Sequence, residues 1–593
     1  MQKLRIFLFA LAALPWLVAG CSKDPEIVDP SQETDTYEAT IKLNATIVNL
    51  SSTEGAKGML VFSVDHEWTL EIPEEATWLS ANKTSGSASK SATISFTAQA
   101  NEGARRSVTC RIRSGAKSKK FTVAQENAVL VLSQSDVKDW DKYYKPGEFN
   151  YDMLRSDATW SWCRSKQSEH FVVFWGRGYG DYGLYGERMG QENTSPSTLS
   201  SGSNLYVDID DLLEKAEEFY RVNINVLKFA DISSGKSNLN KYKMQIYLLH
   251  QTEWVATGGG YDNVIGALWI NPGTCHPVGS TIAHEIGHSF QYMVYCDQIA
   301  NGAPNDFTTG WRYGFGGNGG CGFWEQSAQW QAYQSYAEQA FSTVNFTEFT
   351  NNCHRHFLHE HQRYASYFLM WYWADKYGVE EIGRLWRESK SPEDPCQTYM
   401  RVHGLTVDQF NEEIYEYAAK CCTWDFDVES TNLDEGKLTG TTQSVREFGK
   451  NYIGHIKWEK KASDDWYAVS SSRVPEATGF NHIALNPAAG STVSVDFEGM
   501  AGDPLYNPVS DATIAGWTCG FVALGSDGTR TYSPAEKVKG SATLTFDVPS
   551  GTKNLWFVVA ATPDKYLSHA WDEDNTNDEV WPYRIKVSGT TIK

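Results

Sequence analysis

The sequence feature that most constrains the fold is a pair of histidines four residues apart, His284 and His288, with Glu285 directly after the first. Residues four apart lie on one face of a helix, so both imidazoles can reach one metal ion. Glu285 is rotated by about 100° around the helix axis, which places its carboxylate beside the ion rather than among the ligands. There it can take a proton from a water molecule as a general base. The alternative is that both histidines are only buried in a core.

The segments around this motif predict a mixed α/β region over 128–428. Apolar runs that are typical of strands mostly precede the motif, and segments with helical periodicity follow it. Thr406 and Gln409 form a capping box for the last of these helices. The predicted elements are strands over 168–176, 243–249 and 266–271, and helices over 209–229, over 278–295 and from Phe323, Tyr364 and Val407.

A hydrolytic zinc site needs a third protein ligand and one open position. Glu325 lies 37 residues after His288, at the start of a predicted helix. An HExxH motif followed by such a glutamate resembles the gluzincin metallopeptidases. The resemblance implies that His284, His288 and Glu325 bind one Zn²⁺ and that Glu285 is the catalytic base. Glu338 is an alternative third ligand, and Glu325 can instead be a carboxylate that only stabilises a helix start.

Two longer patterns resemble more specific families. The pattern W-E-x-x-A that starts at Trp324 and the pattern H-E-x-G-H-x-x-Q that starts at His284 are similar to segments of the enhancin-like, mucin-directed peptidases. The W-E helix and the S-E-H-F strand that starts at Ser168 also resemble an uncharacterised zincin-like family of surface lipoproteins. No histidine follows at the spacing of HExxHxxGxxH, which excludes a metzincin.

The gluzincin resemblance also implies where the substrate and the oxyanion are held. Tyr364, on a predicted helix after the glutamate, resembles the tyrosine that stabilises the oxyanion beside the metal. Tyr367 is the alternative, and either tyrosine can instead serve only the core. A strand directly before the metal-binding helix resembles the edge strand to which a peptide substrate adds as a further strand. We expect this substrate-binding strand at Gly266, Ala267, Leu268 and Trp269.

Three other patterns have competing interpretations. The four histidines between His354 and His361 offer a second metal site or an active-site imidazole, but such a run is also typical of a solvated helix face. The acidic run over 572–578 could bind Ca²⁺ through its oxygens, although solvated acidic turns are more common. The segment 178–183 matches G-x-G-x-x-G, but no helix follows, so an aromatic loop is favoured over a dinucleotide site.

The first 21 residues predict export and lipid attachment. Lys3 and Arg5 precede an apolar stretch over 6–19 that is short for a membrane span and ends in small residues. The Val-Ala-Gly-Cys sequence at its end resembles a bacterial lipobox, which implies cleavage before Cys21 and acylation of that thiol. A plain signal peptide is the alternative. Residues 22–36 are expected to be a tether, and their start resembles the signals that send lipoproteins to the outer face of the outer membrane.

The remaining segments predict β-rich domains on both sides of the α/β region. Residues 37–127 alternate short apolar runs with turn residues, as in an Ig-like β-sandwich. Trp68, Trp78 and the closing segment 123–125 resemble a BACON module, a family for which carbohydrate binding has been suggested, although we favour a spacer role. Residues 429–593 return to β-patterned segments and predict a β-sandwich or jelly roll.

The amino-acid composition limits the kinds of molecule that this protein is expected to bind. The net charge of −21 disfavours nucleic acid. The aromatic content of 13% suits sugar-binding or extended substrate grooves, but it equally suits β-sandwich cores. Ten of the eleven cysteines follow Cys21, and seven of these lie between Cys275 and Cys422. In an oxidising compartment this clustering predicts disulfides in the central domain.

Together these features predict a multidomain protein with an N-terminal Ig-like β-sandwich, a central α/β zincin-like domain and a C-terminal β-sandwich or jelly roll. We expect a monomeric, lipid-anchored zinc metallopeptidase at the cell surface that hydrolyses extracellular proteins or glycoproteins. Two alternatives stay open: a surface lipoprotein that binds glycans or glycoproteins and has a non-catalytic metal site, and a zinc hydrolase acting on a glycan or ester. The intact Glu285 argues against a pure binding protein, because binding needs no general base.

Overall fold

The structure is a computed structural model, and it describes residues 39–103, 105–179, 205–306, 308–311, 321–426, 445–506, 511–572 and 574–593. The chain divides between Ala128 and Val129 into two compact units. The predicted signal peptide, Cys21 and the tether lie outside the described residues, as does most of the segment 178–183. No helix in the described part of the chain is long and apolar enough to cross a membrane.

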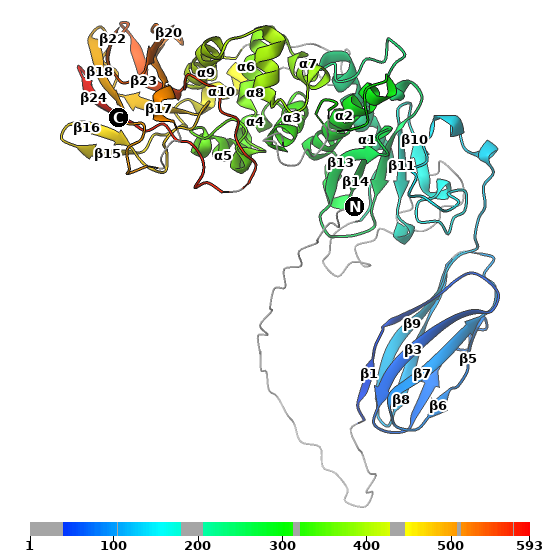
Figure 1. The fold of residues 1–593 in the computed structure, drawn as a ribbon. Coiled ribbons are helices and arrows are strands. Elements are labelled where there is room, and N and C mark those ends of the chain that lie inside the picture. The colour runs from blue at the N-terminus through cyan, green and yellow to red at the C-terminus, as the bar shows by residue number, and fades with distance from the viewer. Residues whose placement is uncertain are drawn as a thin grey trace, which may run out of the picture. The chain divides into compact units, whose positions relative to one another are not determined.

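The described part of the N-terminal unit is a sandwich of two β-sheets (Figure 1). One sheet has the strand order β1-β3-β7-β5 and the other the order β2-β9-β8-β4-β6. Alternate residues of the long strands are buried, so Leu60 and Ile94 of one sheet share a core with Ile112 of the other. This confirms the predicted N-terminal β-domain. Its strands are β1 Ile41–Leu43, β2 Ile47–Leu50, β3 Ala56–Val64, β4 Trp68–Glu71, β5 Leu79–Ala81, β6 Ser85–Gly86, β7 Ser89–Ala98, β8 Arg106–Ser114 and β9 Lys117–Gln125.

The second unit contains a mixed sheet with the order β10-β11-β12-β14-β13. The strands β11, β12 and β14 run parallel, and β10 and β13 are antiparallel to their neighbours at the two edges. Helices α1 and α2 cover one face of the sheet, and aromatic side chains such as Trp160 and Trp162 cover the other. Because both faces are covered, the parallel strands are continuous apolar runs in the sequence. The elements are β10 Ser165–Gln167, β11 Phe171–Trp175, α1 Ile209–Arg221, β12 Met244–Leu248, β13 Ala256–Tyr261, β14 Ile265–Ile270 and α2 Ser280–Ala300.

Helices dominate the chain after this sheet, as the sequence predicts. The predicted capping box is present, with reciprocal bonds between Thr406 and Gln409 at the start of α9. The helix predicted from Tyr364 begins four residues later, at Phe368, after a stretch of turns in which the Ser366 N–H donates to the Gln362 carbonyl. The helices are α3 Cys321–Tyr333, α4 Gln339–Ser342, α5 Val344–Asn352, α6 Phe368–Tyr377, α7 Glu381–Glu388, α8 Pro395–His403, α9 Val407–Cys421 and α10 Val445–Gly449.

Two further sheets form the C-terminal part, with the orders β15-β16-β24-β18-β22 and β17-β23-β19-β20, and β21 lies beside β19. Apolar side chains between the sheets form their own core. The second sheet also contributes Phe480 and Val558 to the core of the helical region, against α9. The helical and C-terminal β-rich parts therefore belong to one compact unit. The strands are β15 Lys460–Ser463, β16 Trp466–Val469, β17 Phe480–Leu485, β18 Thr492–Gly499, β19 Trp517–Gly525, β20 Arg530–Tyr532, β21 Glu536–Val538, β22 Ser541–Asp547, β23 Thr552–Ala561 and β24 Tyr583–Ser588.

The disulfides predicted for the central domain are absent among the nine cysteines whose side chains the structure describes, because all nine are free. All nine are also buried. Burial raises the pKa of the Cys353 thiol to about 12, so this side chain stays protonated at neutral pH. The clustered cysteines thus serve as small apolar residues of the core.

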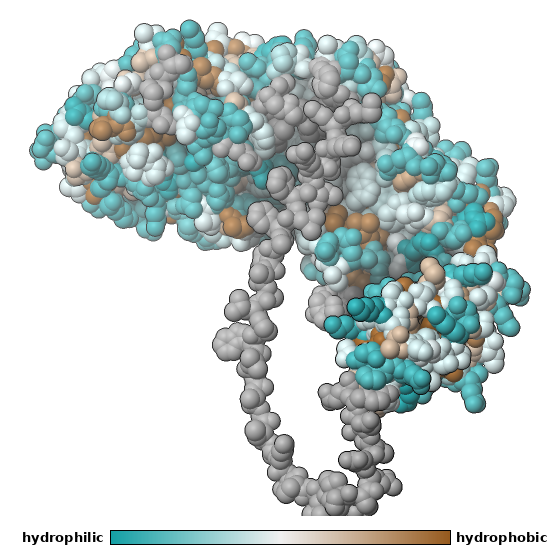
Figure 2. All heavy atoms as spheres, turned by 60° about the horizontal axis from the view of Figure 1, so that its bottom comes forward, coloured by the Kyte–Doolittle hydropathy of each residue, from teal (hydrophilic) through white to brown (hydrophobic). Residues whose placement is uncertain are grey.

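Hydrophilic residues predominate on the face of the molecule drawn in Figure 2, and hydrophobic residues lie among them in small groups. Large hydrophobic side chains that are exposed include Met59, Trp254 and Leu505, at 66%, 65% and 80%. They belong to separate segments of the chain, as isolated surface hydrophobic residues of globular proteins usually do.

Candidate metal centre

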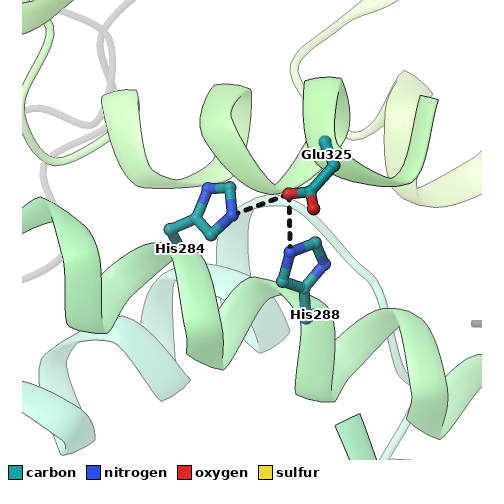
Figure 3. Close-up of side chains that lie close together, drawn as sticks. All are labelled: His284, His288 and Glu325. Carbon is teal, nitrogen blue, oxygen red and sulfur yellow. Dashed lines mark hydrogen bonds and ion pairs between the residues drawn. The ribbon is translucent and has the colours of Figure 1, made fainter. Parts of the chain in front are cut away.

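Two adjacent helices bring the three predicted ligands together (Figure 3). His284 and His288 project from α2, and Glu325 projects from α3. The Nε2 atom of each imidazole lies 3.1 Å from the same carboxylate oxygen, Oε2 of Glu325. One ligand atom from each residue lies within 4.8 Å of the other two, so all three can contact one ion.

The spacing of these atoms fits a small ion. In a tetrahedral zinc site with bonds of about 2.0–2.1 Å, neighbouring ligand atoms lie about 3.3 Å apart. Both contacts to Glu325 are close to that spacing, at 3.1 Å. Two imidazoles and one carboxylate also suit Zn²⁺, whereas Ca²⁺ and Mg²⁺ prefer oxygen ligands alone. Geometry and ligand type therefore both fit zinc.

The electrostatics of the three residues favour a cation. Burial would raise the pKa of Glu325, but hydrogen bonds from His284 and His288 outweigh it and hold that pKa well below its usual range. Burial would lower the pKa of His288, but the carboxylates of Glu325 and Glu285 raise it above its ordinary value. Glu325 is thus ionised over the whole physiological pH range.

A chain of buried amides fixes the orientation of His288. Its Nδ1 atom lies 3.0 Å from Oε1 of Gln291. The Gln291 amide nitrogen donates to the Trp324 carbonyl and to Oε1 of Gln331, so its own oxygen faces His288 as an acceptor. Gln331 in turn donates to Oδ1 of Asn223 at 2.6 Å. Nδ1 of His288 therefore keeps a proton, so a metal ion that displaces the proton on Nε2, which now faces Glu325, would find the Nε2 lone pair.

Gly287 lets the two helices approach closely. A Cβ atom there would lie 3.2 Å from a side chain of α3 and 3.4 Å from Cα of Ala328. This close approach brings Glu325, about one helical turn from Ala328, to the imidazoles. The sequence indicated close packing at Gly287, but Gln291 had no predicted role. Its position three residues after His288, on the same helix face, is the signal that could have identified it.

The predicted base and oxyanion donor lie beside the three ligands. Glu285 is 6% exposed, and its charge contributes to the raised pKa of His288. The Tyr364 hydroxyl donates to Oε1 of Glu325 at 3.0 Å, from the turn before α6. Burial and the Glu325 charge raise the pKa of Tyr364 to about 12, so the phenol keeps its proton at neutral pH. Tyr367 instead donates to a backbone carbonyl inside the core.

The prediction of the substrate-binding edge strand is wrong. Gly266, Ala267, Leu268 and Trp269 belong to β14, which lies inside the sheet between β12 and β13. Its backbone is hydrogen-bonded on both sides and cannot accept a peptide as a further strand. The edge strand beside α2 is β13. The continuous apolar run of β14 is in fact typical of an interior strand.

Glycine allows β13 to lie directly on the metal-binding helix. A Cβ atom at Gly258 would lie 2.1 Å from the carbonyl oxygen of Glu285 and 2.8 Å from Cβ of His288. Among the described strands, β13 pairs with β14 alone, and Gly258 lies against the part of α2 that carries Glu285 and His288. The sequence signal for this hairpin is Asp262-Asn263, which turns from β13 into β14 with φ of 54° and 57°.

The histidine-rich segment is not a solvated helix face, so that interpretation is wrong. His354, His356 and His359 are buried. The segment makes turns and ends in a short 3-10 helix, Glu360–Gln362. Its histidines are held by contacts with the C-terminal part of the chain, such as the bond from His356 to the Leu567 carbonyl.

The carboxylates of the acidic run over 572–578 contact different partners. Asp572 and Asp574 each accept hydrogen bonds from residues of the run itself, in tight turns. Asp578 instead lies 3.4 Å from Nε2 of His359. The described carboxylates of the run therefore do not converge on one point, and the Ca²⁺ site stays a prediction.

A family comparison covers most of the chain. The model of DUF6055, a family of unknown function, matches residues 135–593. This chain belongs to the DUF6055 family. The match extends over both the helical part and the C-terminal β-rich part and assigns no activity to either. The BACON model matches residues 67–126, which confirms the predicted BACON domain at the N-terminus. No curated protein matches this DUF6055 member.

Several solved structures are weakly similar to this DUF6055 member. A *Bacteroides ovatus* GH5 xyloglucanase in complex with a heptasaccharide is 17% identical with a TM-score of 0.14, over 19% of this chain and 23% of the xyloglucanase. A family 22 carbohydrate-binding module of *Clostridium thermocellum* Xyn10B is 15% identical with a TM-score of 0.14, over 23% of this chain and 88% of the module. A *Bacteroides thetaiotaomicron* protein is 15% identical with a TM-score of 0.12, over 17% of this chain and 97% of its own. We draw no conclusion about this chain from likenesses of that strength.

Proposed function

We propose that this protein is a zinc metallopeptidase of the gluzincin type. The observation that carries the proposal is the convergence of His284, His288 and Glu325 on one point, with Glu285 and Tyr364 beside them. A metal site without catalytic function needs only the three ligands. The added carboxylate and phenol are the two groups that hydrolysis of a peptide bond requires.

Each side chain has a defined task in this mechanism. A zinc ion held by the three ligands would act as a Lewis acid and activate a water molecule. Glu285 takes a proton from the attacking water and passes it to the leaving amine. Tyr364 is protonated at neutral pH, so its hydroxyl can donate a hydrogen bond to the oxyanion that develops on the substrate carbonyl. Gln291 holds the ring of His288 in the tautomer that presents Nε2.

The proposed peptide substrate adds to β13 as an antiparallel or parallel strand. The outer edge of β13 has free backbone groups among the described strands, and Gly258 brings that edge against the backbone of α2 at Glu285. A peptide bound there would pass the metal centre with its backbone extended. Backbone hydrogen bonds favour a broad range of sequences, which suits extracellular proteins or glycoproteins as substrates.

The proposed location follows from the N-terminal sequence alone. Lipid attachment at Cys21 would hold the protein at the outer membrane, with the BACON domain between the anchor and the catalytic part. We expect Cys21→Ala to release the protein from the membrane fraction and to abolish labelling by a radioactive fatty acid. Labelling that persists in this variant would contradict the anchor.

The test of the function compares wild-type protein with Glu285→Gln. Zinc content is measured by mass spectrometry, and cleavage is followed with casein and mucin. We expect Glu285→Gln to keep its zinc and to cleave about 1,000-fold more slowly, because it has lost only the general base. Glu338→Gln, an exposed glutamate outside the centre, is the matched control and should behave as wild type.

Three outcomes would contradict the proposal. Absence of zinc from the wild-type protein would show that His284, His288 and Glu325 do not form a zinc site. Equal cleavage by wild type and Glu285→Gln would exclude Glu285 as the base. Zinc in both proteins with hydrolysis of a glycan or ester, but not of casein or mucin, would favour a zinc hydrolase of another substrate class.

A further inference from the structure

A second cluster of histidines and carboxylates lies outside the candidate centre. It consists of His359, His569 and Asp578, and we call it the second cluster. His359 belongs to the turns after α5, and the other two residues belong to the C-terminal segment between β23 and β24. Their ligand atoms lie within 4.8 Å of one another, as in the candidate centre on α2.

The spacing in the second cluster is that of ligands around an ion. Nε2 of His359 lies 3.4 Å from Oδ2 of Asp578, and Nδ1 of His569 lies 3.6 Å from Oδ1. Both distances are long for charge-assisted hydrogen bonds, but they are near the separation of about 3.3 Å between tetrahedral zinc ligands. The three side chains are only 0%, 6% and 8% exposed.

A neighbouring carboxylate orients one of the histidines toward the point of convergence. Nε2 of His569 lies 2.9 Å from Oε2 of Glu360 and donates its proton there. The lone pair of His569 is then on Nδ1, the atom that faces Asp578. A carboxylate that accepts from the far nitrogen of a metal-binding histidine is a common feature of zinc sites.

The second cluster also carries an excess of negative charge. Glu360, Glu476 and Asp578 are all buried, and Arg355 is the guanidinium that lies near them, 3.8 Å from Glu476. Three carboxyl groups are thus buried around one guanidinium. A divalent cation would neutralise this buried group.

We propose that the second cluster binds a second Zn²⁺ through His359, His569 and Asp578. Two imidazoles and a carboxylate suit zinc rather than calcium. Binding requires Arg355, which now contacts Nε2 of His359, to pair with Glu476 instead. Binding also requires the ring proton of His359 to lie on Nδ1. At present Nδ1 accepts a hydrogen bond from the His361 N–H, and the Glu360 carboxylate that would accept from it lies at 3.7 Å.

The position of the second cluster gives this ion a structural role. His359 lies five residues before Tyr364, which donates to Glu325 of the first centre. The guanidinium of Arg363 lies over the rings of both Tyr364 and Trp571, at 5.6 Å and 5.7 Å. An ion at the second cluster would therefore tie the C-terminal segment to the turn that presents Tyr364. The site itself does not depend on the proposed peptidase activity.

The test counts metal ions in the full-length protein. After dialysis against trace zinc, we expect two zinc ions per chain for wild type and one for His284→Ala/His288→Ala. His569→Ala and Asp578→Asn should each bind one, and combining either with the double variant should leave none. Cobalt added to His284→Ala/His288→Ala should give the visible absorption of a tetrahedral site, and Asp578→Asn should abolish it.

Controls separate binding from folding. His361→Ala alters an exposed histidine of the same turn and should keep two ions, and circular dichroism checks that each variant is folded. One ion in wild type and none in His284→Ala/His288→Ala would overturn the proposal. So would unchanged zinc in folded His569→Ala and Asp578→Asn. If only the first centre does not bind zinc, the zinc count gives a different result, because His284→Ala/His288→Ala would then bind as many ions as wild type.

Discussion

The first centre and the second cluster use the same side chains, two histidines and a carboxylate, in different surroundings. His284 and Glu325 of the first centre project from two packed helices, and their side chains are 10% and 13% exposed. Beside them stand Glu285 and Tyr364, and Tyr364 is 41% exposed. In the second cluster the residues belong to a turn and a loop, and His359 is completely buried.

The difference in exposure and in neighbouring residues distinguishes a site that we propose for catalysis from a site that we propose only binds an ion. We propose that a water molecule and a substrate reach the first centre past the exposed Tyr364, next to the proposed base and proton donor. The three ligand side chains of the second cluster are 0%, 6% and 8% exposed, and Glu360, Glu476 and Arg355 lie against them. Closed zinc sites are structural, and catalytic zinc sites keep one position open. The ligand set alone therefore does not decide function; access and the neighbouring groups do.

The largest expected effect comes from Glu325→Ala. Loss of the third ligand should release the metal of the first centre, and the several kcal/mol of stabilisation supplied by a Lewis acid correspond to at least about a 1,000-fold fall in kcat/KM. Zinc at the second cluster should persist, which metal analysis can show. Full activity in a protein that has lost this carboxylate would break the contrast between the two sites.

Tyr364→Phe should lower kcat by about 100-fold, because it removes a hydrogen-bond donor to the oxyanion. Steady-state kinetics on a peptide substrate measure the effect, and zinc content should not change. Tyr367→Phe is the matched control, since its hydroxyl bonds to a core carbonyl and its loss should affect stability instead. If the two variants reduce kcat equally, Tyr364 is not the donor.

Gln291→Leu should weaken zinc binding at the first centre by about 10- to 100-fold, the usual cost of losing a residue that orients a ligand. Competition with a fluorescent chelator measures the dissociation constant. Gln334→Leu removes another fully buried glutamine, directly after α3 and outside the hydrogen-bond chain, and should leave zinc affinity unchanged. Equal affinities in the two variants would show that the amide chain does not position His288.

Chelation should separate the two ions by rate and by effect. A mild chelator is expected to remove the more exposed ion of the first centre first, abolishing activity while the ion of the second cluster stays bound. Prolonged chelation should then empty the second cluster and lower Tm by several further degrees, since an ion at 100 times its Kd stabilises the folded state by about 2.7 kcal/mol. Loss of both ions at the same rate would contradict this order.

Local patterns in the sequence were enough to predict the features that depend only on residues close together in the chain. The periodicity of α2 predicts that His284 and His288 share a face, and Gly287 predicts a close helix contact. The capping box at Thr406 locates the start of α9 within one residue. Family likeness added Glu325, which no local rule singles out from the other carboxylates of the segment.

The order of the strands in the sheet could not be predicted from the sequence, because packing between elements decides which strands pair. The apolar run of β14 favours an interior strand, but the sequence does not show that β13 is the edge strand beside the metal-binding helix. Only when the helix is placed on the sheet does it become clear that Gly258 is the position where a side chain would strike the α2 backbone.

What the sequence determined by itself was the chemistry available to the metal-binding helix, because spacing along one helix fixes which side chains share a face. The tertiary structure decided everything that crosses between elements. It brought Tyr364 to Glu325, oriented the Gln291 amide through its bonds to α3, and joined His359 to His569 and Asp578 across 210 and 219 residues of chain. Contacts over such separations depend on the burial of whole surfaces, and no short pattern encodes them.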